Sequence, residues 1–343
     1  MASKFTVVII GNGTMAAQGL AAVLTHFGTE INVPLVVCDN SDNGVDSDYV
    51  MGDGTAFRKS LKKTAMEHGF KEGETVICGR ANSRRVRECI SNARPHVILS
   101  LQCRDILKGK ILSIPKLGTL NVHNAPLPLL RGCDPFAWAI HDGLKTFGVT
   151  LHCVDLGCDS GDIVAQELFP ISSSDTAWSL FQKSLPCSIT LLKENLLSYL
   201  RKEVQHIPQG NRFVTYHPAH QFSYQPILIE WNTVAVTLSA WIRARIFPPF
   251  QLPFFTMLDK RRSTEIVVMV LECSSIKHTG KSSPGIVRCT KESLQIDAKW
   301  GTIIISKVKV QECILCGTEL AKKYGLVAND DISSTCSKSQ EKI

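Results

Sequence analysis

The chain has 343 residues, of which 44% are hydrophobic and 20% charged, a composition typical of a folded globular protein and not of a disordered one. That length exceeds one ordinary hydrophobic core and predicts one large and one smaller domain. The formal net charge of +7 suits an anionic small substrate or weak attraction to nucleic acid, and establishes neither. No apolar run approaches the ~20 residues of a membrane span, and the apolar start is too short for a signal peptide, so a cytoplasmic protein is expected.

The first two hundred residues alternate between apolar runs and amphipathic segments joined by short links. The apolar runs are typical of buried strands and lie at residues 5–10, 33–40, 74–79, 96–102 and 119–125. Segments with helical periodicity separate them. This alternation predicts an α/β fold, in which helices cover both faces of a Rossmann-like, mainly parallel sheet. Ligands of such sheets bind beyond the carboxyl ends of the strands.

The pattern changes after a long helical segment at residues 174–202. Residues 205–228 contain prolines, glycine and aromatic residues without periodicity, which predicts a linker. Residues 229–327 begin with a helix that ends at Pro248-Pro249 and continue with short β-type runs, which predicts a smaller, β-rich, OB-like domain. The expected organisation is therefore an α/β domain at 1–204, the linker, the β-rich domain, and a disordered tail at 328–343.

The 13 cysteines are scattered mostly one by one in apolar segments, which is typical of reduced, buried thiols. The one close pair is Cys313 and Cys316. A zinc site needs four ligands, and no second pair of this kind accompanies these two residues. We therefore expect no metal site here, and interpret the pair as part of a strand leading into the last helix.

The stretch "LNVHNAPLPLLRG" places Asn121 and His123 at the end of an expected strand. Because side chains alternate along a strand, both should lie on one face of the sheet. Pro126 and Pro128 follow at once, and proline cannot continue a ladder of backbone hydrogen bonds because it lacks an N–H group. The chain must leave the sheet there, which opens room for a ligand beside the amide and the imidazole.

Residues 121–162 resemble the 10-formyltetrahydrofolate-dependent formyltransferases, the family of the methionyl-tRNA and sugar-amine N-formyltransferases. The motifs that carry the resemblance are "NVH", "LP" followed by "RG", "WAI", "GVTLHCVD" and "DSGDIVAQ". The resemblance implies that Asn121, His123 and Asp159 are the catalytic residues, and that 10-formyltetrahydrofolate is the co-substrate. It covers residues 90–200 well and the C-terminal third loosely.

These three residue types suit the transfer of a formyl group to an amine. The oxygen of the attacked formyl group becomes negatively charged, and the Asn121 amide and the His123 imidazole are donors that could stabilise it. Asp159 would hold the imidazole in one tautomer and raise its pKa from about 6.5. With a bound water, Asp159 could also relay the proton of the amine.

The resemblance further implies a folate site after the strand that ends near residue 102. Its residues line the pteridine through main-chain groups, pack on its ring or flank it, and they are Leu101, Gln102, Cys103, Arg104, Ile106, Leu107, Asp155 and Asp162. An ordinary turn from strand to helix is the alternative for the segment after the strand. His152 either contacts the substrate or packs in the interior.

The loop "GNGTMA" contains Gly11, Asn12 and Gly13 and has three interpretations. With Asp39 it imitates a dinucleotide fingerprint, although Ala16 replaces the third glycine. It could instead hold a substrate phosphate at the start of a helix, or be only a tight turn.

The acceptor expected from the sequence is a nucleotide-linked amino sugar or another small metabolite amine. Methionyl-tRNA is the alternative, but residues 40–54 form an acidic loop that would repel phosphates. Hydrolysis of formyltetrahydrofolate and a non-catalytic binding module are lesser alternatives. The sequence predicts no membrane partner and is compatible with a homodimer.

Overall fold

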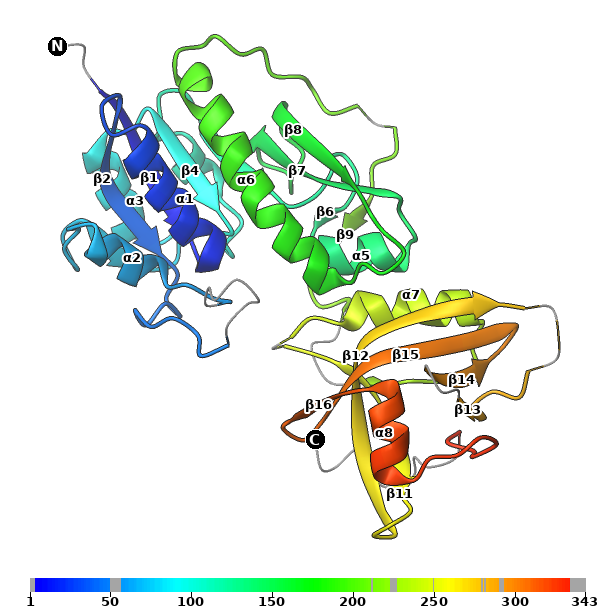
Figure 1. The fold of residues 1–343 in the computed structure, drawn as a ribbon. Coiled ribbons are helices and arrows are strands. Elements are labelled where there is room, and N and C mark those ends of the chain that lie inside the picture. Colours follow the sequence, from blue (N-terminus) through cyan, green and yellow to red (C-terminus); the bar gives the residue numbers. More distant parts are fainter. Residues whose placement is uncertain are drawn as a thin grey trace. The chain divides into compact units, whose positions relative to one another are not determined.

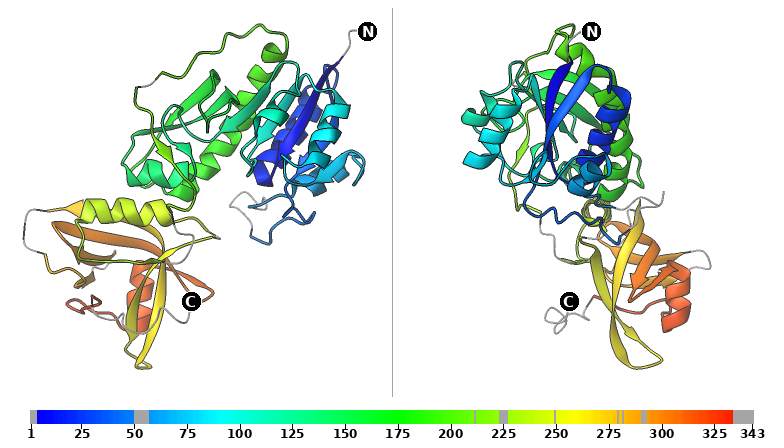
Figure 2. Two further views of the ribbon diagram at one scale, coloured as in Figure 1. Left: turned by 180° about the vertical axis from the view of Figure 1, so that it is seen from behind. Right: turned by 90° about the vertical axis from the view of Figure 1, so that its left-hand side faces the viewer.

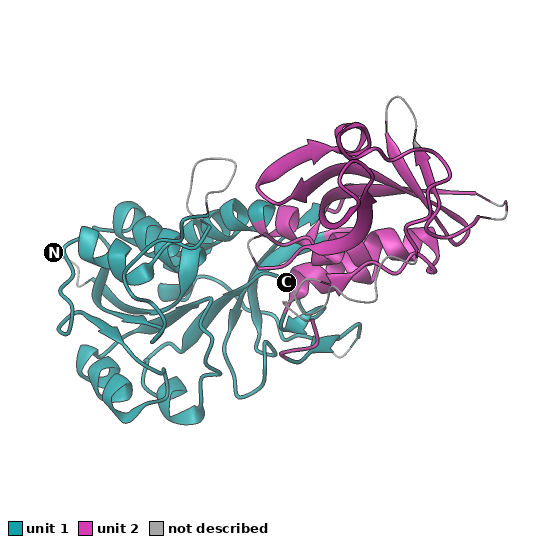
Figure 3. Cartoon of the chain, turned by 90° about the horizontal axis from the view of Figure 1, so that it is seen from below, with its two compact units in different colours: residues 1–133, 147–169, 182–218 teal, residues 134–146, 170–181, 219–343 magenta. Residues whose placement is uncertain are grey.

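The computed structural model describes residues 4–49, 57–210, 212–222, 227–248, 250–278, 280, 282–289 and 293–333. The chain forms two compact units, each assembled from segments that are separate in the sequence (Figure 3). Unit 1 comprises residues 1–133, 147–169 and 182–218. Unit 2 comprises residues 134–146, 170–181 and 219–343. Within the described residues, no helix combines the length and the apolar character needed to cross a membrane.

Unit 1 is built on a sheet whose described strands have the order β3-β2-β1-β4-β5-β7-β8 (Figure 1). These strands are β1 (Phe5–Gly11), β2 (Ile31–Cys38), β3 (Val76–Cys78), β4 (Val97–Leu101), β5 (Thr119–His123), β7 (Thr146–Cys153) and β8 (Ile163–Pro170). The pairs from β3 through to β5 are all parallel, and β7 runs antiparallel to β5. The expected Rossmann-like, mainly parallel sheet is therefore confirmed.

Helices cover both faces of this sheet. Apolar side chains of α3 (Arg84–Ala93) and α4 (Gly109–Leu112) share one core with side chains of β1, β2 and β4. On the other face, α1 (Gly13–His26) lies so close to β4 that a Cβ at Gly19 would approach the Leu101 side chain to 2.4 Å. Two further helices of the chain are α2 (Leu61–Glu67), which packs beside α1, and α6 (Ala177–Leu200).

The helix expected after β4 is much shorter than the sequence pattern suggests. Only Gly109–Leu112 is α-helical in this region. Side chains hold the preceding residues in a loop, since the Asp105 carboxylate accepts from the N–H of Ala81 at 2.7 Å and Asn82 accepts from the N–H of Lys108 at 2.9 Å. These two bonds tie the residues after β4 to the segment that precedes α3.

Unit 2 contains a second sheet, drawn mostly in yellow and orange in Figure 2. Its described strands have the order β10-β11-β12-β15-β14-β13, and β16 pairs with β15. The strands are β10 (Ile227–Leu228), β11 (Pro253–Asp259), β12 (Thr264–Lys277), β13 (Val287–Cys289), β14 (Leu294–Ala298), β15 (Gly301–Val310) and β16 (Cys313–Cys316). Helices α7 (Ala235–Arg245) and α8 (Gly317–Tyr324) contribute buried residues to its core, and the unit also includes α5 (Pro135–His141). The expected β-rich architecture of this region is confirmed.

Two features lie near the C-terminal end of unit 2. Cys316 lies at the end of β16 and caps α8, its sulfur accepting from the N–H of Glu319 at 3.4 Å. Residues 328–333, part of the tail that the sequence predicts to be disordered, include the buried Ile332, whose N–H donates to the carbonyl of Gly285 at 3.0 Å. The rest of that tail, 334–343, lies outside the described residues.

Candidate active site

The antiparallel pairing of β5 with β7 brings four polar side chains together at the carboxyl end of β5. Asn121 lies directly opposite His152, and His123 lies opposite Thr150. Because each pair of residues on one strand is separated by a single residue, all four side chains lie on the same face. The alternation of "NVH" on one strand and "TLH" on the other therefore produces a polar patch at the edge where ligands of parallel sheets bind.

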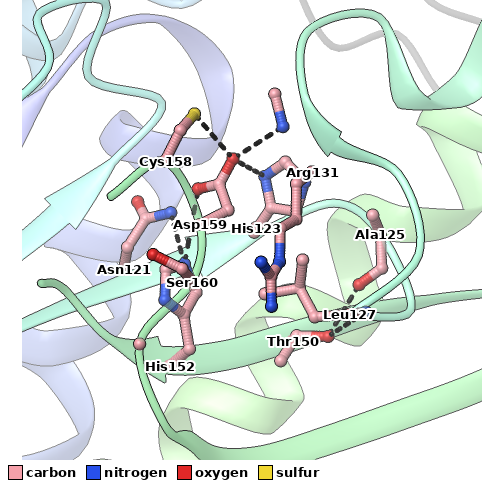
Figure 4. A network of polar contacts seen from close by, with 12 residues as sticks. Asn121, His123, Ala125, Leu127, Arg131, Thr150, His152, Cys158, Asp159 and Ser160 are labelled. Carbon is pink, nitrogen blue, oxygen red and sulfur yellow. Dashed lines mark hydrogen bonds and ion pairs between the residues drawn. The ribbon is translucent and has the colours of Figure 1, made fainter. Parts of the chain in front are cut away.

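Asn121 and His152 are joined by a hydrogen bond. Nδ1 of His152 lies 2.8 Å from the carbonyl of Cys153, so that nitrogen carries the proton of the neutral ring. Nε2 then accepts from the side-chain Nδ2 of Asn121 at 3.1 Å. The His152 side chain is only 2% exposed, so it orients the Asn121 amide from the interior (Figure 4).

The carbonyl of Leu130 orients His123. Nε2 of His123 lies 2.9 Å from that oxygen and therefore donates to it. The neutral ring then has an unprotonated Nδ1, which faces Oδ2 of Asp159 at 3.7 Å. That separation is too long for a hydrogen bond. The tautomer that Asp159 was expected to fix is instead fixed by the Leu130 carbonyl, in the turn after β5.

The Asp159 carboxylate lies within the loop between β7 and β8, where it makes several polar contacts (Figure 4). Oδ2 accepts from the backbone N–H of Gly132 at 2.9 Å, and the Cys158 thiol approaches the same oxygen at 3.6 Å. Oδ1 lies 3.6 Å from Nε2 of His152. The Asp159 side chain is 15% exposed, so the carboxylate is shielded from water but still accessible.

Burial and neighbouring charges shift the pKa values of His123 and Asp159 in opposite directions. Burial lowers the pKa of His123 below its usual value, and the nearby Asp159 carboxylate and Leu130 carbonyl offset this only in part. Burial would raise the pKa of Asp159, but His123, His152 and the N–H of Gly132 together hold that pKa well below its usual value. The pKa of His123 is therefore not raised as expected from the sequence: Asp159 acts in that direction, but burial has the larger effect. At neutral pH the imidazole is neutral and the carboxylate ionised.

The turn after β5 is held by a second polar network. The Thr150 hydroxyl donates to the carbonyl of Ala125 at 2.6 Å and accepts from the N–H of Leu127 at 3.3 Å. Gln166 of β8 donates to the carbonyl of Leu127 at 2.9 Å. The turn continues into the short strand β6 (Arg131–Gly132), which pairs with β9 (Tyr216–His217).

A scan against models of protein families matches residues 3–188 to the family described as "Formyl transferase". This chain belongs to the formyl transferase family. It is 31% identical over 248 residues to the bifunctional polymyxin resistance protein ArnA of Wigglesworthia glossinidia brevipalpis, a match that covers 70% of this chain and spans only 36% of that protein's length. It is 26% identical to a methionyl-tRNA formyltransferase of Methylacidiphilum infernorum, over 89% of this chain and 90% of that protein.

A solved structure has the same fold. It is an N-formyltransferase from Helicobacter canadensis in complex with folinic acid and dTDP-3-aminofucose. The similarity has a TM-score of 0.65 at 22% sequence identity, and it covers 88% of this chain and 98% of that one.

The residues expected to line a folate in this formyl transferase differ in their surroundings. Ile106 is 65% exposed, whereas Leu107 is buried in the core shared by α3 and α4. Cys103 is partly buried in the same core, and burial raises its thiol pKa to about 11. The Arg104 guanidinium lies 3.3 Å from the Ser41 hydroxyl in the loop after β2.

The two acidic residues that flank Asp159 in the sequence have distinct partners. Asp155 accepts from the N–H of Gly157 at 3.0 Å and from the hydroxyl of Ser160 at 2.7 Å, so it orders the loop from within. Asp162 instead lies 2.8 Å from Nδ1 of His206.

The glycine-containing loop after β1 is closed by β4. The N–H of Asn12 donates to the carbonyl of Leu101 at 3.2 Å, and a Cβ at Gly11 would lie only 2.1 Å from that oxygen. The Gln102 side chain then accepts from the N–H of Met15 in the first turn of α1, at 3.1 Å. One of the N–H groups that could have bound a phosphate is therefore used within the protein.

No sequence pattern indicates a role for the Leu130 carbonyl, the Gly132 N–H, Arg131 or Gln209. Leu130 and Gly132 both lie in the "LLRG" segment, part of the family motif. Their positive φ angles, 61° and 92°, aim the backbone groups at His123 and Asp159. Nearly every residue has a backbone carbonyl and N–H, so the sequence does not show which of these groups point into a site. Here the glycine at position 132 is the one hint.

Proposed function

We propose that this formyl transferase moves the formyl group of 10-formyltetrahydrofolate to a primary amine. The observation that supports this most directly is the convergence of Asn121, His123 and Asp159 at the carboxyl end of β5, with a neutral imidazole beside an ionised carboxylate. An amine nucleophile needs a base close to it, and the carbonyl under attack needs a donor.

Each side chain has a role that its contacts allow. Nδ1 of His123 accepts the proton that the amine loses as its nitrogen bonds to the formyl carbon. Asp159, ionised and 3.7 Å away, stabilises the imidazolium that results. Asn121 uses one N–H for His152 and offers the other to the formyl oxygen as that oxygen becomes negatively charged. When the bond from the formyl carbon to the folate nitrogen breaks, His123 returns the proton to that nitrogen.

The folate is proposed to bind along the carboxyl edge of the sheet. The segment 102–107 follows β4, the loop 155–162 follows β7, and β4 and β5 are neighbours in the sheet. The Helicobacter canadensis relative was solved with folinic acid, a formylated folate. Main-chain groups of Leu101, Gln102, Cys103 and Arg104, with the exposed Ile106, would face it on one side. Leu107, Asp155 and Asp162 would support those segments.

The acceptor is proposed to be a nucleotide-linked amino sugar or another small metabolite amine. The Helicobacter canadensis structure contains an amino sugar attached to dTDP and aligns over nearly its whole length. A polar edge of the sheet that already holds a buried base suits a small amine. Methionyl-tRNA is the second candidate, because the Methylacidiphilum infernorum relative also aligns over most of both chains.

The test supplies the full-length protein with 10-formyltetrahydrofolate and a panel of amines that includes dTDP-amino sugars, UDP-amino sugars and methionyl-tRNA. Mass spectrometry then identifies which amine gains a formyl group. We expect transfer to an amino sugar, and loss of that transfer in Asp159→Asn, which preserves the shape of the side chain. Formate release without any acceptor would identify a hydrolase instead, and no reaction with any compound would contradict the proposal.

A further inference from the structure

We propose that Gln209 is a positioning residue, whose side-chain amide holds the loop that carries Asp159 so that the carboxylate stays beside His123. The inference rests on the proposed function for the roles of Asp159 and His123. Gln209 lies outside the matched residues 3–188, in a segment that the sequence pattern assigned to a linker.

The Gln209 amide makes four hydrogen bonds. Its Nε2 donates to the backbone carbonyls of Asp159, at 2.9 Å, and Gly161, at 2.7 Å. Its Oε1 accepts from Nε and Nη2 of Arg131, at 3.0 and 2.7 Å. These partners determine the orientation of the amide, because two carbonyl oxygens need a donor and a guanidinium needs an acceptor. A side chain that has only one of these functions can satisfy only one pair.

The two pairs of bonds connect the segment that bears the carboxylate to the segment that binds it. Arg131 immediately precedes Gly132, whose N–H donates to Oδ2 of Asp159 at 2.9 Å. Gln209 therefore closes a ring of contacts around the carboxylate. Asp159 has a φ angle of 50°, a left-handed conformation that residues other than glycine rarely adopt. Such a conformation persists only where surrounding contacts enforce it, and Gln209 supplies two of them.

The chain on both sides of Gln209 is anchored without the help of its side chain. Ile207 and Ile163 exchange two backbone hydrogen bonds, both of 2.8 Å. Further along, Tyr216 and His217 pair with Arg131 and Gly132 as β9 and β6. Replacing the Gln209 side chain should therefore leave the fold intact, so that its effect can be measured at Asp159.

Three variants separate the functions of the amide. Gln209→Met removes both functions at similar length. Gln209→Glu keeps an acceptor for Arg131 but presents an oxygen to two carbonyl oxygens. Gln205→Glu, an exposed position on the same segment, is the charge-matched control. We expect both Gln209 variants to lower kcat, by up to roughly 10²-fold for a displaced catalytic group, with little change in the KM for the folate. Gln205→Glu should behave like the unmodified protein.

A second measurement does not depend on transfer. Asp159 and His152 are the titratable groups that act on His123. An NMR titration can follow the His123 ring, identified by the signal missing in His123→Gln. We expect the pKa of His123 in Gln209→Met to fall toward that in Asp159→Asn, because the carboxylate that raises it has moved away.

The two measurements distinguish the two proposals. If no amine is formylated by the unmodified protein, the proposed function fails, and the titration still decides the role of Gln209. A His123 titration that is unchanged in Gln209→Met but shifted in Asp159→Asn overturns the positioning role. An unchanged titration in both variants also overturns it, because the coupling that Gln209 would maintain is then missing.

Discussion

At the scale of single residues, two backbone groups of one turn set the chemical state of the site. The carbonyl of Leu130 fixes the proton of His123 on Nε2, and the N–H of Gly132 helps to keep Asp159 ionised. The imidazole thus presents a lone pair on Nδ1 before any substrate arrives. A base that is already deprotonated at neutral pH can take the proton of an incoming amine.

The first residue-scale prediction concerns Asn121. Asn121→Leu keeps the size of the side chain and removes the donor, so it should lower kcat by roughly 10²–10³-fold, the usual effect of losing one oxyanion donor. The rate is measured by the mass-spectrometric assay at saturating folate. Stabilisation by folinic acid, read as the rise in Tm, should persist and would show that the site is intact. Near-normal turnover in this variant would remove Asn121 from the mechanism.

The second residue-scale prediction concerns the pH dependence of stability. The pKa of His123 is lower in the folded protein than the usual 6.5 of an unfolded chain, so the unfolded state binds more protons as pH falls through that value. The free energy of unfolding should therefore decrease with falling pH, and His123→Gln should flatten this decrease. Denaturant titrations between about pH 5.5 and 7.5 measure the difference, a window that lies above the titration of the carboxylates.

His96, whose pKa is also lowered, is present in both proteins and cancels in that comparison. Parallel curves for the two proteins would mean that the His123 ring titrates as it does in the unfolded chain. The buried, neutral imidazole described above would then be wrong.

At this scale the sequence predicted the side chains but not their backbone partners. The two-residue period of a strand predicted that Asn121 and His123 share one face of the sheet. The family resemblance predicted that Asp159 belongs to the same site. Gln209 contacts Asp159 across 50 residues of chain, and Leu130 contacts Thr215 across 85. Contacts of that sequence separation depend on the tertiary path of the chain, which no local pattern encodes.

At the scale of elements, the register of β5 against β7 is the feature that assembles the site. A slip of one residue would turn Asn121 and His123 to the opposite face of the sheet. The sequence predicted the strand β5 and its polar residues, and those of β7 lie in the family motif "GVTLHCVD". It did not predict that the pair is antiparallel, because the direction of β7 depends on the route of the chain through β6 and α5.

The element-scale prediction concerns Gly132 in β6. Its φ angle is 92°, and a Cβ there would lie 2.2 Å from the carbonyl of His217. Gly132→Ala should destabilise the protein by more than the roughly 1–2 kcal/mol that the left-handed conformation alone costs an alanine. It should also lower kcat, because the N–H that binds Asp159 would move. Denaturant unfolding and the transfer assay measure the two effects.

Gly69 provides a matched control. It has a similar φ angle of 86°, and nothing would lie within 4 Å of its Cβ. Gly69→Ala should therefore show the conformational cost alone and leave kcat unchanged. Equal destabilisation by the two substitutions would mean that β6 can move away from β9 without cost.

At the scale of the whole molecule, the distribution of charge affects which acceptor amine can bind. The net charge of +7 is small for a chain of 343 residues. The described part of the loop after β2 contains Asp39, Asp42, Asp46 and Asp48. Asp42 and Asp46 are used within the protein, where they accept hydrogen bonds from Ser60. Two of these four carboxylates therefore hold the described part of the loop in place, and we expect this acidic segment to repel phosphates.

The whole-molecule prediction follows from this charge distribution. We expect tRNA to bind only weakly, and methionyl-tRNA not to be formylated at a rate comparable with the amino sugar. Binding is measured as a function of salt between about 50 and 200 mM, where each phosphate contact adds to the slope of log K against log salt. Tight binding with a steep slope, together with formylation of methionyl-tRNA, would show that the acceptor is a tRNA.

The ring of contacts that Gln209 closes around Asp159 also affects how the protein can be dissected. A piece ending shortly after α6 would retain every strand of the parallel sheet and all three proposed catalytic side chains. It would nonetheless lose Gln209 and β9. Any fusion joint, protease site or domain exchange intended to preserve catalysis therefore belongs beyond Pro218, where unit 1 ends.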